Sequence, residues 1–157
     1  MKIELLLIGK TSYPYISEGM DVYGKRLAKY FPFSVEILES PKQWSNLPPE
    51  QLKEKEGEMV LKRLTTDDFL VMLDEKGKEF TSEQFAAQME KWLNQSKKRM
   101  VFLVGGAFGF SPAMYARADA KLALSKMTFS HQMIRIFVLE QIYRGMSILH
   151  NEPYHNS

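Results

Sequence analysis

The sequence contains no cysteine among its 157 residues. It can therefore form no disulfide, no thiolate metal site and no cysteine nucleophile, and the absence fits a reducing compartment. No apolar run approaches the ~20 residues of a membrane span, and the run Leu5–Ile8 is too short for a signal-peptide core. Internal repeats and low-complexity tracts are missing as well. We therefore expect a cytoplasmic protein that contacts neither a membrane nor a metal.

Two common nucleotide-binding motifs are also absent. No G-x-x-x-x-G-K-[ST] occurs, which excludes a P-loop. The glycine-rich segment 105–109 is not G-x-G-x-x-G, and it follows the fourth expected strand rather than the first. A doubly wound nucleotide-using enzyme, such as a small reductase or kinase, is therefore a poor fit.

The composition is that of a soluble globular protein, with 45% hydrophobic and 25% charged residues. The length predicts one domain, residues 1–157, that buries roughly 70% of the surface of its unfolded chain. Charge is unevenly divided: residues 1–96 carry 13 basic and 16 acidic side chains, whereas residues 97–157 carry 8 and 3, together with all three histidines. The basic last third favours contact with an anionic partner such as a nucleotide or an RNA backbone, although a purely solvated charge distribution explains it equally well.

Short apolar runs alternate with amphipathic stretches along the whole chain. This order predicts an α/β fold, a mostly parallel sheet flanked by helices. Thr81 with Gln84 forms a capping-box pattern, and Ser111-Pro112 is typical of a helix start. The segment 40–49, rich in proline and polar residues, predicts a loop. We expect strands at 2–8, 34–38, 69–73, 100–104 and 122–124, and helices at 15–30, 49–64, 82–94, 113–118 and 132–149.

Apolar spacing indicates which face of each helix is buried. The last helix, 132–149, is apolar nearly all round, which favours a second copy of the chain as its partner; the alternative is a central helix buried within one subunit. The expected core positions of the first three helices are Ile16, Met20, Tyr23 and Leu27, then Leu52, Met59, Val60 and Leu64, then Phe85, Met89, Trp92 and Leu93.

Three loops follow the carboxyl ends of expected strands, where parallel sheets bind ligands: those after Leu73, Val104 and Leu124. Glycines at 105, 106 and 109 let the backbone approach a ligand, although a plain tight turn explains them too. Backbone groups of the loop 124–132 could read an adenine edge while its apolar side chains pack on the ring. The alternative is an ordinary connection with Phe129 in the core.

The C-terminal segment places Tyr154 beside His155, after Pro153. A stacking ring next to a titratable imidazole suits a splayed-out base. Together with the other segments, this one resembles the RlmH family, small SPOUT-class methyltransferases that act on ribosomal RNA. The resemblance spans nearly the whole chain and rests on Lys55–Glu58, Leu73-Asp74, Gly105-Gly106, Gly109–Pro112, Leu124–Thr128, His131, Arg135, Glu140–Arg144 and Pro153–His155.

The resemblance implies a C-terminal trefoil knot, an exception to the rule against knots, and a homodimer that binds S-adenosylmethionine in the knot. It implies methylation of N3 of a pseudouridine in a stem-loop of 23S ribosomal RNA, with the assembled ribosome as substrate. Two positions depart from the family: Ser130, where relatives often have proline, and Asn156, where they often have a basic residue. By motif match, the cofactor contacts are Leu73, Gly105, Gly106, Leu124, Ser125, Lys126, Met127, Thr128 and Phe129.

Methyl transfer from a sulfonium is an in-line displacement, and the uracil-type N3–H needs a proton acceptor or a cation near the developing anion. We hypothesise that His155 or His131 accepts the proton and that Tyr154 stacks on the base. Arg135 or Arg144 would hold a phosphate or the negative charge. Alternatively, His131 is a cap or core residue, and Arg144 pairs with Glu140 four residues before it.

Two rival functions use the same residues. One is a ribosome-binding factor without catalysis, which would not bind S-adenosylmethionine. The other is a SPOUT methyltransferase that acts on tRNA, which we expect less because a chain of this size has little room for an extra RNA-binding domain, and this favours a substrate that supplies its own recognition surface.

Overall fold

A five-stranded parallel sheet organises the part of the chain that the computed structural model describes, residues 1–156. The strands are in the order β2-β1-β4-β3-β5, and every adjacent pair is parallel. This arrangement confirms the expected α/β class. In chain order the elements are β1 (Lys2–Ile8), α1 (Pro14–Leu27), β2 (Phe33–Leu38), the 3-10 helix η1 (Lys42–Asn46), α2 (Pro49–Arg63), β3 (Asp68–Lys78), α3 (Ser82–Leu93), β4 (Arg99–Val104), α4 (Pro112–Arg117), β5 (Ala120–Leu122) and α5 (Met133–Leu149).

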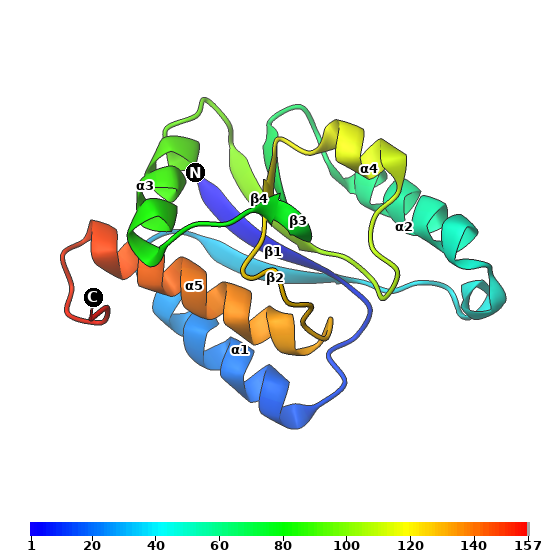
Figure 1. The fold of residues 1–157 in the computed structure, drawn as a ribbon, viewed down its shortest axis with the longest axis horizontal. Helices are drawn as coiled ribbons and strands as arrows, with labels where there is room; N and C mark the ends of the chain where they lie inside the picture. The colour runs from blue at the N-terminus through cyan, green and yellow to red at the C-terminus, as the bar shows by residue number, and fades with distance from the viewer. Residues whose placement is uncertain (157) are drawn as a thin grey trace.

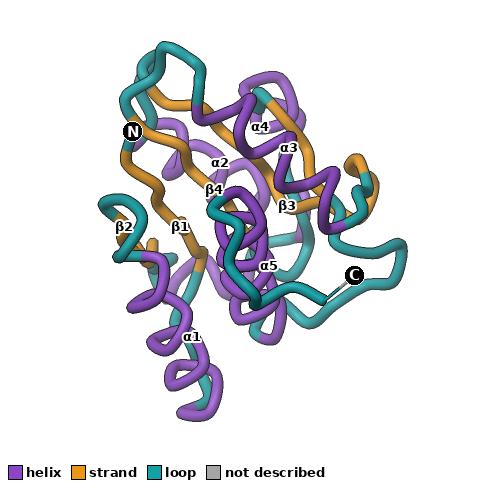
Figure 2. The backbone as a smooth tube through the Cα atoms, turned by 90° about the vertical axis from the view of Figure 1, so that its left-hand side faces the viewer, coloured by secondary structure: helices purple, strands orange, loops and turns teal. Residues whose placement is uncertain are grey.

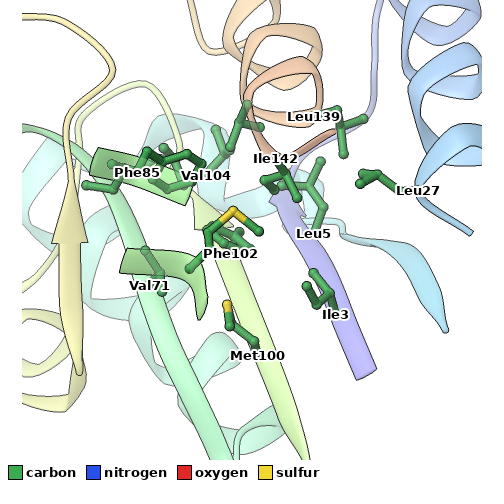
Figure 3. Close-up of a cluster of buried hydrophobic side chains, with 14 of the residues drawn as sticks. Ile3, Leu5, Leu27, Val71, Phe85, Met100, Phe102, Val104, Leu139 and Ile142 are labelled. Carbon is green, nitrogen blue, oxygen red and sulfur yellow. The ribbon is translucent and has the colours of Figure 1, made fainter. Parts of the chain in front are cut away.

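Helices cover both faces of the sheet (Figure 1). Alternate side chains of each strand point to opposite faces, so Leu5 and Phe102 pack under α1, α3 and α5, whereas Leu6 and Leu103 pack under α2 and α4. The larger core lies on the first face (Figure 3). Helix α5 runs between α1 and α3 across the middle of that face (Figure 2).

The sequence signals for helix ends are confirmed. Oγ1 of Thr81 accepts a hydrogen bond from the backbone N–H of Gln84 (3.1 Å), and Oε1 of Gln84 accepts one from the backbone of Thr81 (3.0 Å). The Ser111 hydroxyl caps α4. The expected core positions of α1 and α3 are buried or half-buried.

Two expectations about strand bounds were wrong. β3 does not end at Leu73 but continues to Lys78, because its polar end pairs with β5 beyond a bulge and needs no apolar side chains there. β5 covers 120–122 rather than 122–124. In α2, Val60 is buried and Leu52, Met59 and Leu64 are half-buried, as expected, while Glu56 and Gly57 are buried as well because the helix packs against α4.

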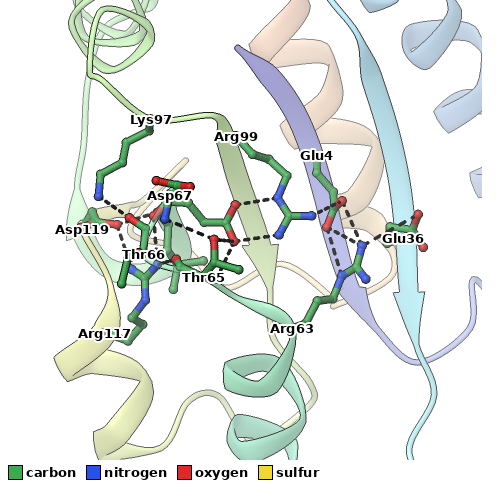
Figure 4. Close-up of polar contacts among 12 residues, drawn as sticks. Glu4, Glu36, Arg63, Thr65, Thr66, Asp67, Lys97, Arg99, Arg117 and Asp119 are labelled. Carbon is green, nitrogen blue, oxygen red and sulfur yellow. Dashed lines mark hydrogen bonds and ion pairs between the residues drawn. The ribbon is translucent and has the colours of Figure 1, made fainter.

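An ion-pair cluster lies at the amino-terminal edge of the sheet, opposite the edge where the strands end (Figure 4). Glu4 is 1% exposed and accepts hydrogen bonds from both Arg63 and Arg99. Arg99 also donates to both carboxylate oxygens of Asp68 (2.8 and 2.7 Å). The cluster joins β1, β3, β4 and α2 through charged groups that are largely out of water.

Candidate functional site

The carboxyl ends of β4 and β5 and the second half of β3 surround a cavity of about 680 Å³. In the strand register, Leu73 lies opposite both Val104 and Leu122, so β4 and β5 end at the level of Leu73, and β3 continues beyond it. Because all strands are parallel, the loops that follow leave from the same edge and meet there. The cavity is therefore a direct result of the topology.

Eight of the nine predicted cofactor contacts line this cavity. The exception is Lys126, which is exposed and whose Nζ lies 4.0 Å from a Glu79 carboxylate oxygen. The eight are Leu73, Gly105, Gly106, Leu124, Ser125, Met127, Thr128 and Phe129.

The glycines of the β4–α4 loop are required by close packing behind the cavity. A Cβ on Gly105 would lie 2.9 Å from the ring of Phe110, and one on Gly106 would lie 2.9 Å from both carboxylate oxygens of Glu56. Gly109 has a backbone φ of +86°, which residues other than glycine rarely adopt. These contacts indicate that the glycines allow the β4–α4 loop to pack closely against Phe110 and Glu56, which a plain tight turn would not require.

The loop from Leu124 to His131 is held by its own hydroxyl groups. The Ser125 hydroxyl accepts from the backbone N–H of Met127 (3.0 Å), and the Thr128 hydroxyl donates to Glu75. The Ser130 hydroxyl accepts from the N–H of Met133 at the start of α5 (3.0 Å). The departure from proline at this position thus supplies a contact that holds the loop.

Phe129 lines the cavity and packs against Phe137 on the outer side of α5, with ring centroids 5.3 Å apart. Phe129 is half-buried and Phe137 is 40% exposed. The structure thus places Phe129 in the site rather than in the core, and connects it to an uncovered apolar position of α5.

Of the two residues predicted at the start of α5, His131 is exposed and lines the cavity. Arg135 is fully buried. Its guanidinium donates to the carbonyls of His131 (3.1 Å) and Ile8 (3.1 Å) and to the hydroxyl of Thr11 (2.8 Å). Burial lowers the pKa of Arg135. The hypothesis that Arg135 grips a phosphate does not fit this placement; the side chain instead ties the β1–α1 loop to the segment lining the cavity.

The C-terminal segment packs on the second half of α5. The hydroxyl of Tyr154 donates to Oε1 of Glu140 (2.9 Å), and Nε of Arg144 donates to the same oxygen (3.1 Å). Nη1 of Arg144 lies 3.0 Å from Nδ1 of His155, whose Nε2 lies 3.1 Å from Glu83. The ion pair of Arg144 with Glu140, which the sequence offered as the alternative to a contact with substrate, is thus present as part of a larger cluster.

The hydrogen bonds of this cluster indicate which of its groups donate and which accept. Arg144 remains charged, since the hydrogen bond to Glu140 raises its pKa. It can only donate, so Nδ1 of His155 accepts and Nε2 carries the proton that faces Glu83. Burial, with hydrogen bonds to Tyr23 and Glu140, raises the pKa of Tyr154. Tyr154 is therefore a neutral phenol here.

Within one chain the structure does not bring the C-terminal cluster to the cavity. Ile134 lines the cavity and Arg144 belongs to the cluster; ten residues of helix separate them by about 15 Å. The predicted residues therefore form two groups at opposite halves of α5.

Sequence reasoning missed four groups at the cavity. Lys53 of α2 lines it, and so does Asp74, which accepts a hydrogen bond from Tyr115 (2.7 Å). Burial and the Asp74 contact raise the pKa of Tyr115 to about 12. Burial also raises the pKa of Glu56, which lies behind Gly106. Glu56 and Asp74 carried a signal only as part of the family resemblance, in the segments Lys55–Glu58 and Leu73-Asp74, whereas Lys53 and Tyr115 carried none.

Within residues 1–156, no three His, Asp or Glu side chains are grouped as a metal site would require. No helix in that range is both long and apolar enough to traverse a bilayer.

Comparison with known proteins gives consistent matches over the full chain. A family model described as "Predicted SPOUT methyltransferase" matches residues 1–155. A protein named "Ribosomal RNA large subunit methyltransferase H" from Parabacteroides distasonis is 55% identical over 156 residues, which is 99% of both chains. Proteins of the same name from Christiangramia forsetii and Flavobacterium johnsoniae are 47% identical over 99% of both chains.

Proposed function

The chain belongs to the RlmH family of SPOUT methyltransferases, and we propose that it transfers a methyl group from S-adenosylmethionine to N3 of a pseudouridine in 23S ribosomal RNA of the assembled ribosome. The relatives' names assign them to the RNA of the large ribosomal subunit. The basic last third of the chain suits such an anionic substrate. Work on ribosomes would place the protein in the cytoplasm.

The cavity fits an adenosyl group. Its volume is typical of small-molecule sites, which range over about 300–1,000 Å³ and combine apolar walls with a few polar groups. Leu73, Leu124 and Phe129 supply apolar surface for a purine ring, and the loop backbone supplies donors and acceptors for its edge. When bound there, the sulfonium would supply the activated methyl group.

We propose that the working enzyme is a two-fold dimer, because one chain leaves its C-terminal cluster about 15 Å from its cavity. If two α5 helices pack antiparallel, the second half of one lies beside the first half of the other, which brings Tyr154 and His155 to the partner's cavity. Phe137 supplies an exposed apolar contact for that packing.

In this dimer the chain's residues have three tasks. The cavity loops hold the donor so that the methyl lies in line with N3 of the base. Tyr154 stacks on the base. His131, or His155 once it is released from Arg144, accepts the N3 proton, and Arg144 stabilises the developing negative charge.

The observation that carries this proposal is the cavity of about 680 Å³ that β3 and the ends of β4 and β5 surround. The test incubates the protein and labelled S-adenosylmethionine with ribosomes, free 23S RNA and tRNA, and maps any methylated base. The matched control is Leu124→Arg, which fills the cavity from a half-buried rim position. We expect label on one pseudouridine of ribosomes with the wild type and none with the variant. Donor binding without methylation of any RNA, or label on tRNA alone, would contradict the proposal.

A further inference from the structure

The loop between β1 and α1 is held firmly against the start of α5 (Figure 1). The backbone N–H of Ser12 donates to Oε1 of Gln132 (2.8 Å), and Nε2 of Gln132 donates to the carbonyl of Lys10 (3.0 Å). Gln132 is buried, and the buried Arg135 adds a bond to Thr11 (2.8 Å). Two buried polar side chains thus fix a short surface loop.

The end of this loop and the first turn of α1 present two aromatic rings to solvent. Tyr13 and Tyr15 are 50% and 58% exposed, and their rings stack with centroids 5.5 Å apart and planes at 21°. They stand among the most exposed large hydrophobic side chains of residues 1–156. Paired, nearly parallel and fixed in place, the rings offer a flat surface that a third ring can extend.

The same part of α5 holds both this loop and the cavity. Gln132 binds the loop, while His131 before it and Ile134 after it line the cavity. Arg135 likewise joins the carbonyl of His131 to Thr11. The two tyrosines therefore stand next to the reaction site and share its supports.

We propose that the Tyr13–Tyr15 pair is a stacking platform for an unpaired RNA base beside the target nucleotide. The proposal rests on the proposed function, since it presumes an RNA substrate at the cavity. Proteins recognise single-stranded RNA by stacking splayed bases on aromatic rings, and such stacking is indifferent to base identity. The platform would orient the loop that carries the target without reading its sequence.

The surroundings of the pair favour RNA over a second copy of the chain. Lys10 and Ser12 are exposed, with Nζ of Lys10 3.9 Å from a carboxylate oxygen of Glu39, and Thr11 and Ser17 add half-buried hydroxyl groups. A subunit interface is expected to have an apolar centre, which the exposed Phe137 on α5 supplies instead. A lysine and hydroxyl groups beside stacked rings suit a nucleotide better than an apolar partner.

The test compares two double variants, Tyr13→Ala with Tyr15→Ala, and Tyr13→Phe with Tyr15→Phe. The first removes both rings and the second keeps them. Methylation is measured against ribosome concentration, the donor's Kd by calorimetry and the molecular mass by light scattering. Because stacking contributes about 1–3 kcal/mol per base, we expect the alanine variant to raise the KM for ribosomes roughly tenfold or more. The phenylalanine variant should stay within about twofold of wild type, and both should keep the donor's Kd and the mass.

The outcomes distinguish a failure of the stacking-platform proposal from a failure of the proposed function. An active wild type with an unchanged KM in the alanine variant overturns the platform and leaves the proposed function standing. A drop in mass on alanine substitution assigns the rings to a second copy and also overturns it. A wild type that methylates no RNA refutes the proposed function itself.

Discussion

Replacing Asp68 by asparagine tests whether the ion-pair cluster stabilises the fold. Asp68 is 3% exposed; its Oδ2 accepts from the backbone of Thr65 (2.8 Å) and from Nη2 of Arg99 (2.7 Å), and its Oδ1 accepts from Nε of Arg99 (2.8 Å). Both carboxylate oxygens face donors, so either orientation of an asparagine amide turns its NH₂ group toward an N–H. Removing one partner of a buried ion pair costs about 3–5 kcal/mol.

We therefore expect Asp68→Asn to lower the free energy of unfolding by about 3 kcal/mol, and Tm by roughly 6–12 °C for a chain of this size. The matched control is Asp67→Asn at the next residue. Asp67 pairs with Lys98 (3.2 Å) on the surface, where the two side chains are 52% and 84% exposed. That exposed pair contributes about 0–1 kcal/mol. The free energy of unfolding is measured by calorimetry or urea unfolding. An equal decrease in the two variants would refute the reasoning.

The pH dependence supplies a second check. Burial alone would raise the pKa of Asp68, but hydrogen bonds from Arg99 and Thr65 outweigh it and hold the pKa below its usual value. The stabilisation is thus complete above the unfolded pKa of about 3.9 and is lost as pH falls through the lower folded pKa. The unfolding curves of wild type and Asp68→Asn should converge in that acid range. Since the cluster lies at the edge opposite the cavity, the folded variant should keep the donor affinity of the wild type.

Two further substitutions test the site. Gly106→Ala places a Cβ 2.9 Å from both carboxylate oxygens of Glu56; we expect about 1–3 kcal/mol of destabilisation and weaker donor binding, both partly restored by Glu56→Ala in the same chain. Thermal unfolding measures the loss of stability, and titration with the donor measures its Kd. A Kd equal to that of the wild type would argue against a role for the packing of Gly106 on Glu56 in donor binding. Phe137→Asp should yield a monomer without methyltransferase activity. The control is Ile37→Asp, because Ile37 is 41% exposed and Phe137 is 40% exposed; this variant should stay dimeric and active. Light scattering measures the mass, and an activity assay measures methylation.

The sequence was sufficient wherever one local pattern determined the structure. Apolar runs bounded by polar residues placed the strands, and the parallel arrangement brings the expected loop segments after Val104 and Leu124 to the same edge as the β3 segment that continues beyond Leu73. The Thr81–Gln84 capping box needed only two residues at the right spacing. Eight of the nine expected cofactor contacts line the cavity for the same reason: seven follow the ends of β4 and β5, and Leu73 of β3 lies beside those ends.

What the sequence did not reveal depends on partners far apart in the chain. Arg135 sits on an apolar helix like any charged residue, and only the fold shows that its acceptors are Ile8 and Thr11. The burial of Glu56 likewise follows from its contact with Gly106, fifty residues later. A knot depends on the path of the chain and not on periodicity, so the trefoil knot stays a prediction from the family.

Mixed dimers test most directly whether each reaction site takes its cavity from one chain and its C-terminal segment from another. One parent carries Leu124→Arg in the cavity, and the other carries Tyr154→Ala with His155→Ala. Each parent alone should be inactive. When equal amounts are co-expressed, about half of the dimers are mixed and each of these holds one complete site, so we expect about one quarter of wild-type activity. Activity no higher than that of the two inactive parents, with mixed dimers verified by mass spectrometry, would contradict the account.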